Sequence, residues 1–196
     1  MDSHDRHSAK SQVRASITAY RRELTSADLQ ISDAMRTSRV LSRLRMINPQ
    51  VVACYASQGH EPGTRELLVA LRDMAVRVLL PALAPDVTEP RWTWWTQEPT
   101  TFTSKGFLAS ATPLFNSQVL TQADVIIVPG LAGTRHGVRL GRGGGWYDRA
   151  LAHTRSKTPR WLLLHDTEVL DQVPSDIWDQ PATALVTEQR WIDCSR

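Results

Sequence analysis

A short apolar run followed by a glycine-rich segment constrains this chain more than any other feature. Residues 124–129 (DVIIVP) are apolar, which is typical of a strand buried on both faces of a parallel sheet. Residues 137–149 (GVRLGRGGGWYDR) follow and end in an expected helix. In parallel sheets ligands bind outside the carboxyl ends of the strands, where the loop after Val128 would lie. The two segments therefore predict an α/β fold with a binding site at this loop.

The rest of the chain alternates strand and helix patterns in the same way. Apolar runs predict further strands at residues 51–55, 76–81, 161–165 and 184–187, and a strand near a sheet edge at 91–96. Helices are predicted at residues 8–25, from Ser26 to the Asn48–Pro49 breaker, and from residues 61–64 through Leu71. Residues 97–121 are polar and irregular, which indicates a long loop region. This alternation predicts three layers, with a mostly parallel central sheet flanked by helices.

Length and composition limit the class of protein. At 196 residues and 41% hydrophobic, the chain can bury one sizeable core, so we expect a single α/β domain over residues 1–196, with N-terminal helices in 1–48. No apolar run approaches the roughly 20 residues of a membrane helix, and residues 1–10 lack the apolar part of a signal peptide, so a cytoplasmic protein is expected. Cys54 and Cys194 have no spacing typical of a disulfide framework or a zinc site.

The formal net charge of +3 is mild, and the arginines form no block of like charges. A positively charged cleft attracts anionic small molecules, such as nucleotides or polyglutamates, at least as well as nucleic acid. Composition therefore does not decide between these partners.

The glycine-rich segment carries chemistry suited to phosphate. Gly143, Gly144 and Gly145 can adopt positive φ, so that successive amides converge on an anion at a helix start. Arg139 and Arg142 supply forked donors. Asp148 is an oxygen ligand of the type that holds Mg²⁺ beside a nucleotide.

Other readings of the same segment stay open at this point. No Gly-Lys-Ser/Thr closes a Walker A loop, and Trp146 stands where the third glycine of a dinucleotide motif would fall. A plain glycine turn with solvated arginines is the simpler interpretation.

Further motifs make the chain resemble the 5-formyltetrahydrofolate cyclo-ligase family. Residues 124–129 and 137–149 are similar to the family's central signature. Lys10 and Arg14 fall in a segment similar to the family's amino-terminal KxxLR, and Glu61 and Thr64 in one similar to its ExxT. The terminal region, from Val173 through Asp179 to Thr187, also matches. The resemblance covers nearly the whole chain.

The resemblance implies conversion of 5-formyltetrahydrofolate to 5,10-methenyltetrahydrofolate with ATP and Mg²⁺, releasing ADP and phosphate. Its partners would be small molecules, with neither nucleic acid nor a membrane, and we expect a monomer. By resemblance, Asp148 and Asp179 hold the metal, and Arg142 and Tyr147 are the catalytic residues. The remaining roles that it implies are ATP binding by Lys10, Arg14, Arg139, Leu140, Gly141, Arg142, Gly143, Gly144, Gly145, Trp146 and Tyr147, and substrate binding by Glu61, Arg142, Gly143, Gly144, Gly145 and Trp146.

The chain departs from the family pattern at a few positions. Gly133 and Thr134 replace an apolar residue and an aspartate, Trp178 replaces a histidine before Asp179, and Thr183 stands where an aspartate is usual. These departures motivate an alternative, a folate- or nucleotide-binding protein of the same fold that has lost turnover. A third possibility is nucleic-acid binding through the arginine-rich first helices, which requires affinity that falls steeply with salt.

Several site residues also have a simpler interpretation that involves no ligand. Lys10 and Arg14 would otherwise be a solvated helix face. Glu61 would be a favourable charge in the first turn of a helix. The tryptophans at 92, 94 and 95 are read as packing residues rather than as a ligand platform.

Overall fold

A seven-stranded sheet forms the centre of the protein in the computed structural model, which describes residues 3–82, 89–96 and 113–195. The strand order is β3-β2-β1-β4-β7-β8-β9. The five inner strands, β2 to β8, pair in parallel, and β3 and β9 pair antiparallel at the two edges. The strands span β1 Val51–Ala53, β2 Arg77–Ala82, β3 Arg91–Trp94, β4 Val125–Pro129, β7 Arg160–Leu163, β8 Ala184–Val186 and β9 Trp191–Asp193.

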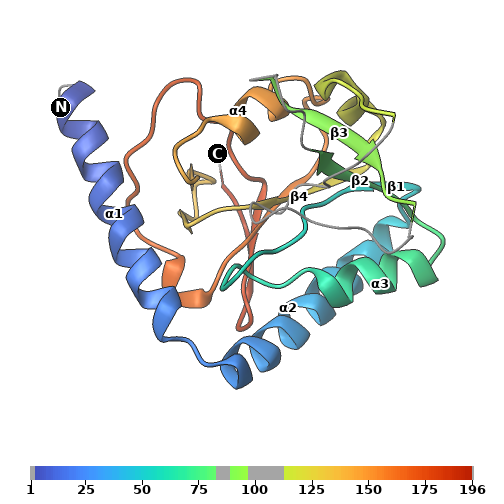
Figure 1. Ribbon diagram of the computed structural model, residues 1–196, viewed down its shortest axis with the longest axis horizontal. Helices are drawn as coiled ribbons and strands as arrows, with labels where there is room; N and C mark the ends of the chain where they lie inside the picture. The colour runs from blue at the N-terminus through green and yellow to red at the C-terminus, as the bar shows by residue number, and fades with distance from the viewer. Residues whose placement is uncertain (1–2, 83–88, 97–112, 196) are drawn as a thin grey trace.

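Helices cover both faces of this sheet (Figure 1), so the predicted three-layer α/β class with a mostly parallel sheet is confirmed. Helices α2 (Ser26–Ile47) and α3 (Arg65–Asp73) lie on one face. The 3-10 helix η1 (Ser117–Gln122) and α4 (Trp146–Leu151) lie on the other.

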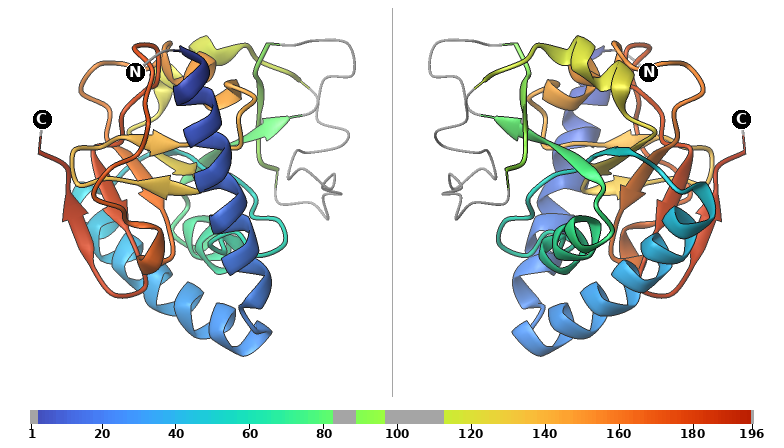
Figure 2. Two further views of the ribbon diagram at one scale, coloured as in Figure 1. Left: turned by 90° about the vertical axis from the view of Figure 1, so that its left-hand side faces the viewer. Right: turned by 90° about the vertical axis from the view of Figure 1, so that its right-hand side faces the viewer.

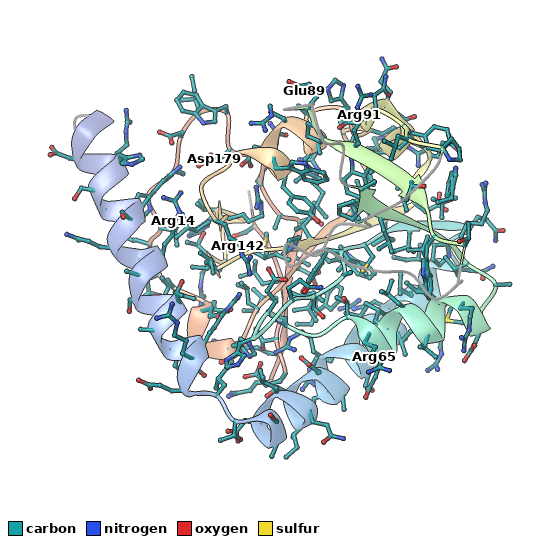
Figure 3. The ribbon with its side chains drawn as sticks, in the orientation of Figure 1. Arg14, Arg65, Glu89, Arg91, Arg142 and Asp179 are labelled. Atoms are coloured by element: carbon teal, nitrogen blue, oxygen red, sulfur yellow. The ribbon has the colours of Figure 1, made fainter. Side chains whose placement is uncertain are left out.

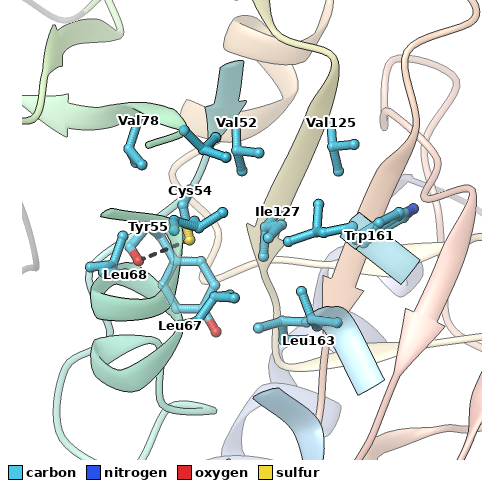
Figure 4. Packing of buried hydrophobic residues seen from close by; sticks show 14 of the residues in the cluster. Val52, Cys54, Tyr55, Leu67, Leu68, Val78, Val125, Ile127, Trp161 and Leu163 are labelled. Carbon is cyan, nitrogen blue, oxygen red and sulfur yellow. Dashed lines mark hydrogen bonds between the residues drawn. The ribbon is translucent and has the colours of Figure 1, made fainter. Parts of the chain in front are cut away.

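Alternate residues of the inner strands feed two separate cores. On the α2–α3 face, Val52, Val125 and Ile127 pack with leucines of both helices (Figure 4). On the opposite face, Ile126 and Val128 pack against η1 and α4. A continuous apolar run is therefore needed in β4, because each of its successive side chains enters one core or the other.

Helix α1 (Ser3–Glu23) stands apart from both layers and crosses in front of the carboxyl ends of the strands (Figure 2). Arg21 fixes it there, because its guanidinium donates to Glu168 and to the Gly130 carbonyl at the end of β4. Glu168 lies in the 3-10 helix η2 (Asp166–Glu168) after β7. Closer to the amino terminus, Val13 packs against Leu140.

Most predicted elements occur, with shifted ends. The first helix starts at Ser3 rather than residue 8, and the second ends at Ile47 because Asn48 adopts the left-handed conformation with φ of 51°. The predicted edge strand is β3, in which Trp92 is buried in the core as expected. The helix after Glu61 begins only at Arg65, so the interpretation of Glu61 as a first-turn charge is wrong.

Five elements were absent from the prediction. They are η1, η2, the edge strand β9, and the hairpin of β5 (Ala132–Gly133) and β6 (Arg139–Leu140). The predicted loop region at 97–121 lies mostly outside the described residues. The prediction is wrong for its last residues, because the 3-10 helix η1 begins at Ser117.

The strand order reverses between β1 and β4, since β2 lies on one side of β1 and β4 on the other. The carboxyl-terminal side of such a switch point is where open α/β sheets bind ligands. The segment after β1 carries Glu61, and the segment after β4 carries the glycine loop. Within the described residues, no helix is long and apolar enough to cross a membrane.

Candidate active site

A cavity of about 910 Å³ opens at this switch point, near the upper end of the roughly 300–1,000 Å³ usual for ligand sites. Its walls come from α1, the segments after β1 and β4, and the loop before β8. Figure 3 shows Arg14, Arg142 and Asp179 on the side of the sheet that faces α1. Every residue predicted for the site lines this cavity: Lys10, Arg14, Glu61, Arg139, Leu140, Gly141, Arg142, Gly143, Gly144, Gly145, Trp146, Tyr147, Asp148 and Asp179.

The glycine loop has the open backbone that the sequence predicted. Gly143 has φ of 103° and Gly145 has φ of 61°, and both values are strained for other residues. Within the described chain, the amides of Gly143 and Gly144 donate to no protein acceptor. Two unused N–H donors therefore belong to residues that line the cavity. The helix that follows has only six residues, so its dipole adds less than the sequence reading implied.

Arg14 lies directly against this loop. Its Nε donates to the Gly141 carbonyl at 3.0 Å, and a Cβ on Gly143 would lie 3.4 Å from its guanidinium carbon. No carboxylate among the described residues pairs with Arg14. A full positive charge thus stands beside the unused amides, which is the arrangement that recognises a phosphate.

Lys10, one turn earlier on α1, is held between two carboxylates. Its ammonium lies 2.7 Å from Asp176 Oδ2 and 2.8 Å from Asp179 Oδ2, and only 8% of the residue is exposed. Burial alone would lower the pKa of Lys10, but hydrogen bonds and charges from both aspartates hold it above its ordinary value. Lys10 is therefore fully charged and fixed in place.

Arg139 and Asp148 form a second internal ion pair at 2.5 Å, with the arginine buried. The same carboxylate oxygen of Asp148 accepts from the Gln180 amide at 3.1 Å. Arg139 Nε is buried and has no partner within the described structure. Arg139 consequently anchors Asp148 to the floor of the cavity.

Arg142 reaches across the cavity from the glycine loop to Glu61, with 2.9 Å between Nη2 and Oε1. Glu61 Oε2 accepts from the Gln58 amide at 2.9 Å. The Arg142 side chain is 59% exposed, so solvent weakens the pair and a ligand can displace it. The residues proposed for the nucleotide and for the folate thus contact one another directly.

An aromatic cluster joins the cavity to the core, since Trp146 and Tyr147 line the cavity and the buried Trp92 packs behind them. The ring centroids of Trp146 and Tyr147 are 4.8 Å apart, and that of Trp92 lies 5.2 Å from Trp146. Burial raises the pKa of Tyr147 well above 10. Its phenol therefore stays protonated at neutral pH, in the form that can donate a hydrogen bond but cannot act as a base.

Asp148 and Asp179 supply oxygen donors of the kind that Mg²⁺ prefers. Among the described residues, no three His, Cys, Asp or Glu side chains cluster as a protein-only metal site would require. Mg²⁺ beside a nucleotide commonly uses one or two carboxylates, with phosphate oxygens and waters completing its shell. The donor set fits Mg²⁺ in that mode.

Some cavity residues were missed from the sequence. Asp176 shares Lys10 with Asp179 and also donates its amide to Asp179 Oδ2 at 2.8 Å. The only signal for Asp176 was a second aspartate three residues before Asp179. Other unassigned lining residues include His7, Ser11, Tyr55, Arg149 and Trp178.

Two departures from the family pattern have structural explanations. A Cβ on Gly133 would lie 2.8 Å from Leu162 and 3.1 Å from Leu185, so leucines of the sheet fill the space of an apolar side chain there. Thr183 Oγ1 accepts from the Arg160 amide at 2.9 Å and thereby joins the ends of two strands. Both positions serve packing, while Trp178 lies at the cavity itself.

The sequence of this chain matches a family of known enzymes over nearly its whole length. The model of the 5-formyltetrahydrofolate cyclo-ligase family matches residues 6–188. The chain belongs to this family. It is therefore a ligase of folate one-carbon metabolism.

Relatives and solved structures agree with this assignment. The 5-formyltetrahydrofolate cyclo-ligase of Mycolicibacterium smegmatis is 34% identical over 188 residues, covering 94% of this chain and 96% of that protein. The enzyme of the same name from Escherichia coli is 29% identical, with 87% and 95% covered. The Aquifex aeolicus 5,10-methenyltetrahydrofolate synthetase has a similar fold, with a TM-score of 0.79 and 23% identity; the match covers 95% of this chain and 93% of that chain. The 5,10-methenyltetrahydrofolate synthetase of Mycoplasma pneumoniae also has a similar fold, with a TM-score of 0.73 and 19% identity; the match covers 91% of this chain and 98% of that chain.

Proposed function

We propose that this ligase, a single-domain cytoplasmic monomer, uses ATP with Mg²⁺ to convert 5-formyltetrahydrofolate to 5,10-methenyltetrahydrofolate, releasing ADP and phosphate. The observation that carries the ATP requirement is Arg14, which has no carboxylate partner among the described residues and lies against the open amides of the glycine loop. Both proposed ligands are soluble metabolites, and all proposed site residues come from one chain.

The phosphates of ATP would lie between α1 and the glycine loop. Arg14 and the amides of Gly143 and Gly144 bind the phosphate oxygens. Lys10 and Arg139 add charge at two further sides of the cavity. Together these groups position the γ-phosphate and stabilise its charge, which is most of what phosphoryl transfer requires of a protein.

Asp148 and Asp179 would hold the metal, because both carboxylates face the same cavity. Bound Mg²⁺ supplies charge neutralisation at the phosphates. A carboxylate engaged by the ion would interact less with its present cation, so Arg139 would lose part of its pairing with Asp148, while Lys10 would keep Asp176 as a partner.

The formyl oxygen of the folate is a poor leaving group until it is phosphorylated. It attacks the γ-phosphorus, the bond to the β-phosphate oxygen breaks, and ADP departs. The N10 amine then attacks the activated formyl carbon and loses its proton. Phosphate leaves with the former formyl oxygen, and the methenyl bridge between N5 and N10 remains. No step needs a protein nucleophile.

Arg142 and Tyr147 are the side chains proposed to act on the reacting groups. Arg142 stabilises negative charge on the phosphoryl group during transfer. Tyr147, kept protonated by burial, donates a hydrogen bond. Glu61 accepts from N–H donors of the pterin ring, and Trp146 contributes an aromatic surface next to it.

A coupled assay tests the proposal. The purified protein should form the methenyl chromophore from 5-formyltetrahydrofolate only when ATP and Mg²⁺ are both present, with one ADP per turnover. Folded protein that binds both substrates but forms neither chromophore nor ADP would instead establish the binding-protein alternative. Sedimentation velocity tests the monomer.

A further inference from the structure

The segment that carries Glu61 is held by contacts from outside the cavity. Residues 57–64 form no helix or strand, yet polar groups of α1, α2 and η2 contact them. His60 lies against the Arg21 carbonyl and, through its own carbonyl, against His165 Nε2 at 3.3 Å. Such contacts fix a loop without taking part in the chemistry.

Asp33 makes a further contact with this segment. This α2 residue accepts a hydrogen bond from the Gly63 amide, with 2.7 Å between the amide nitrogen and Oδ1. A Cβ on Gly63 would lie only 2.0 Å from Asp33 Oδ2. Glycine at position 63 is therefore what allows the carboxylate to come so close.

Arg36 in turn fixes Asp33. Its Nη1 lies 2.6 Å from Asp33 Oδ1, and only 1% of the arginine is exposed. The same guanidinium donates to the Leu164 carbonyl at 3.0 Å and to Glu188 at 3.1 Å. Asp33, whose side chain is 25% exposed, is thus held by a buried arginine that is itself fixed at the ends of β7 and β8, and it has little freedom to move.

We propose that Asp33 is a positioning residue for Glu61, and that it thereby sets the affinity for the pterin end of the folate. The inference rests on the proposed function of Glu61. Gly63 is two residues from Glu61, so its amide bond to Asp33 fixes the backbone from which the Glu61 carboxylate extends. Asp33 does not line the cavity and contacts neither proposed ligand site directly.

A double-mutant cycle tests this mechanism. Dissociation constants for 5-formyltetrahydrofolate and for a non-hydrolysable ATP analogue are measured by calorimetry on wild type, Asp33→Ala, Glu61→Gln and the double variant. Asp33→Ala should weaken folate binding about 10-fold, the loss expected for one hydrogen bond to a charged group, and should change analogue affinity less than twofold. In the Glu61→Gln background it should have no further effect.

Two further variants keep the test decisive. Asp33→Asn retains an oxygen that can accept from Gly63, so it should recover part of the lost folate affinity and serves if the alanine variant is too unstable. Asp73→Ala removes an exposed acid paired with Arg72 and should leave both affinities unchanged.

The possible failures are distinguishable. Equal losses for folate and the ATP analogue, or losses that add fully in the double variant, would overturn the role of Asp33 alone. Unchanged folate affinity in Glu61→Gln would overturn the proposed role of Glu61, and the inference about Asp33 with it.

Discussion

Arg14 is the residue whose loss should affect ATP most selectively. Its guanidinium has no carboxylate partner among the described residues, so Arg14→Ala leaves no buried acid unpaired and the fold should be retained. We expect the KM for ATP to rise roughly 10- to 100-fold, as for loss of a hydrogen bond between charged groups. The KM for the folate should stay within twofold. Arg22→Ala, on an exposed position of the same helix, is the control, and equal effects of both variants would contradict a specific role.

Asp148 should be needed for turnover, and its loss should lower stability without preventing folding, because Arg139 is then left without its carboxylate partner. Asp148→Asn keeps an oxygen that can accept from the Gln180 amide, while it removes the charge that a metal ligand needs. We expect kcat to fall at least roughly 100-fold, with the circular dichroism spectrum unchanged. Asp171→Asn, at an exposed position, should retain wild-type kcat. Normal turnover of the Asp148 variant over a magnesium titration would remove this residue from the metal site.

At the scale of elements, α1 is held mainly by the buried pair of Arg21 and Glu168, with 2.6 Å between Nε and Oε1. Arg21→Met leaves the Glu168 carboxylate buried without its partner, so we expect a loss of about 3 kcal/mol in the free energy of unfolding. Adding Glu168→Gln should restore part of that stability, because a buried amide costs less than an unpaired charge. Urea denaturation measures both, and a double variant less stable than Arg21→Met would argue against this cause.

The elements that could be predicted are those whose local pattern matches their final burial. Residues 125–129 are apolar because both faces of β4 are covered, and this is visible in the sequence. The β5–β6 hairpin could not be predicted, because two-residue strands have no measurable periodicity. The first residues of α1 were missed since they are polar, and their helical conformation continues a helix anchored elsewhere by Arg21.

For the site, the sequence predicts some properties of the residues and not others. Their types and approximate location follow from the motif, since the loop lies at the carboxyl end of a buried strand. Their pairings do not, because Lys10 lies 166 residues from Asp176 in sequence and the contact depends on how α1 crosses the sheet. Asp33 escaped notice for the same reason, as its partner Gly63 lies in a loop 30 residues away in the sequence.

For the whole molecule, His165 should make stability depend on pH. Burial, followed by the charge of Arg36, lowers its pKa from 6.5 to about 4. Between these values the unfolded chain binds a proton that the folded protein does not, so the free energy of unfolding falls as the pH decreases from about 6.5 toward 4. From pH 7 to 4.5 the contribution of this group is roughly 2 to 3 kcal/mol.

Replacement of the imidazole isolates that contribution. His165→Gln should be less stable than wild type at pH 7, where it loses contacts with Arg36 and His60, but should lose less stability on acidification. Urea denaturation at pH 7 and 4.5 gives the difference. His136→Gln, at an exposed position, should follow the wild-type curve, and an identical acid loss in His165→Gln would assign the effect to other groups.

Lys10 with Asp179 and Arg139 with Asp148 are ion pairs that already exist in the cavity before a ligand enters it, whereas Arg14 has no carboxylate partner among the described residues. Free ATP therefore finds Arg14 available, but Lys10 and Arg139 are already paired with carboxylates, and a lone divalent ion finds Asp148 and Asp179 engaged by these cations. Each ligand should therefore bind more tightly when the other is present, and calorimetry should show strong positive linkage between nucleotide and metal. A cell short of magnesium would then hold this enzyme idle even with ATP in abundance.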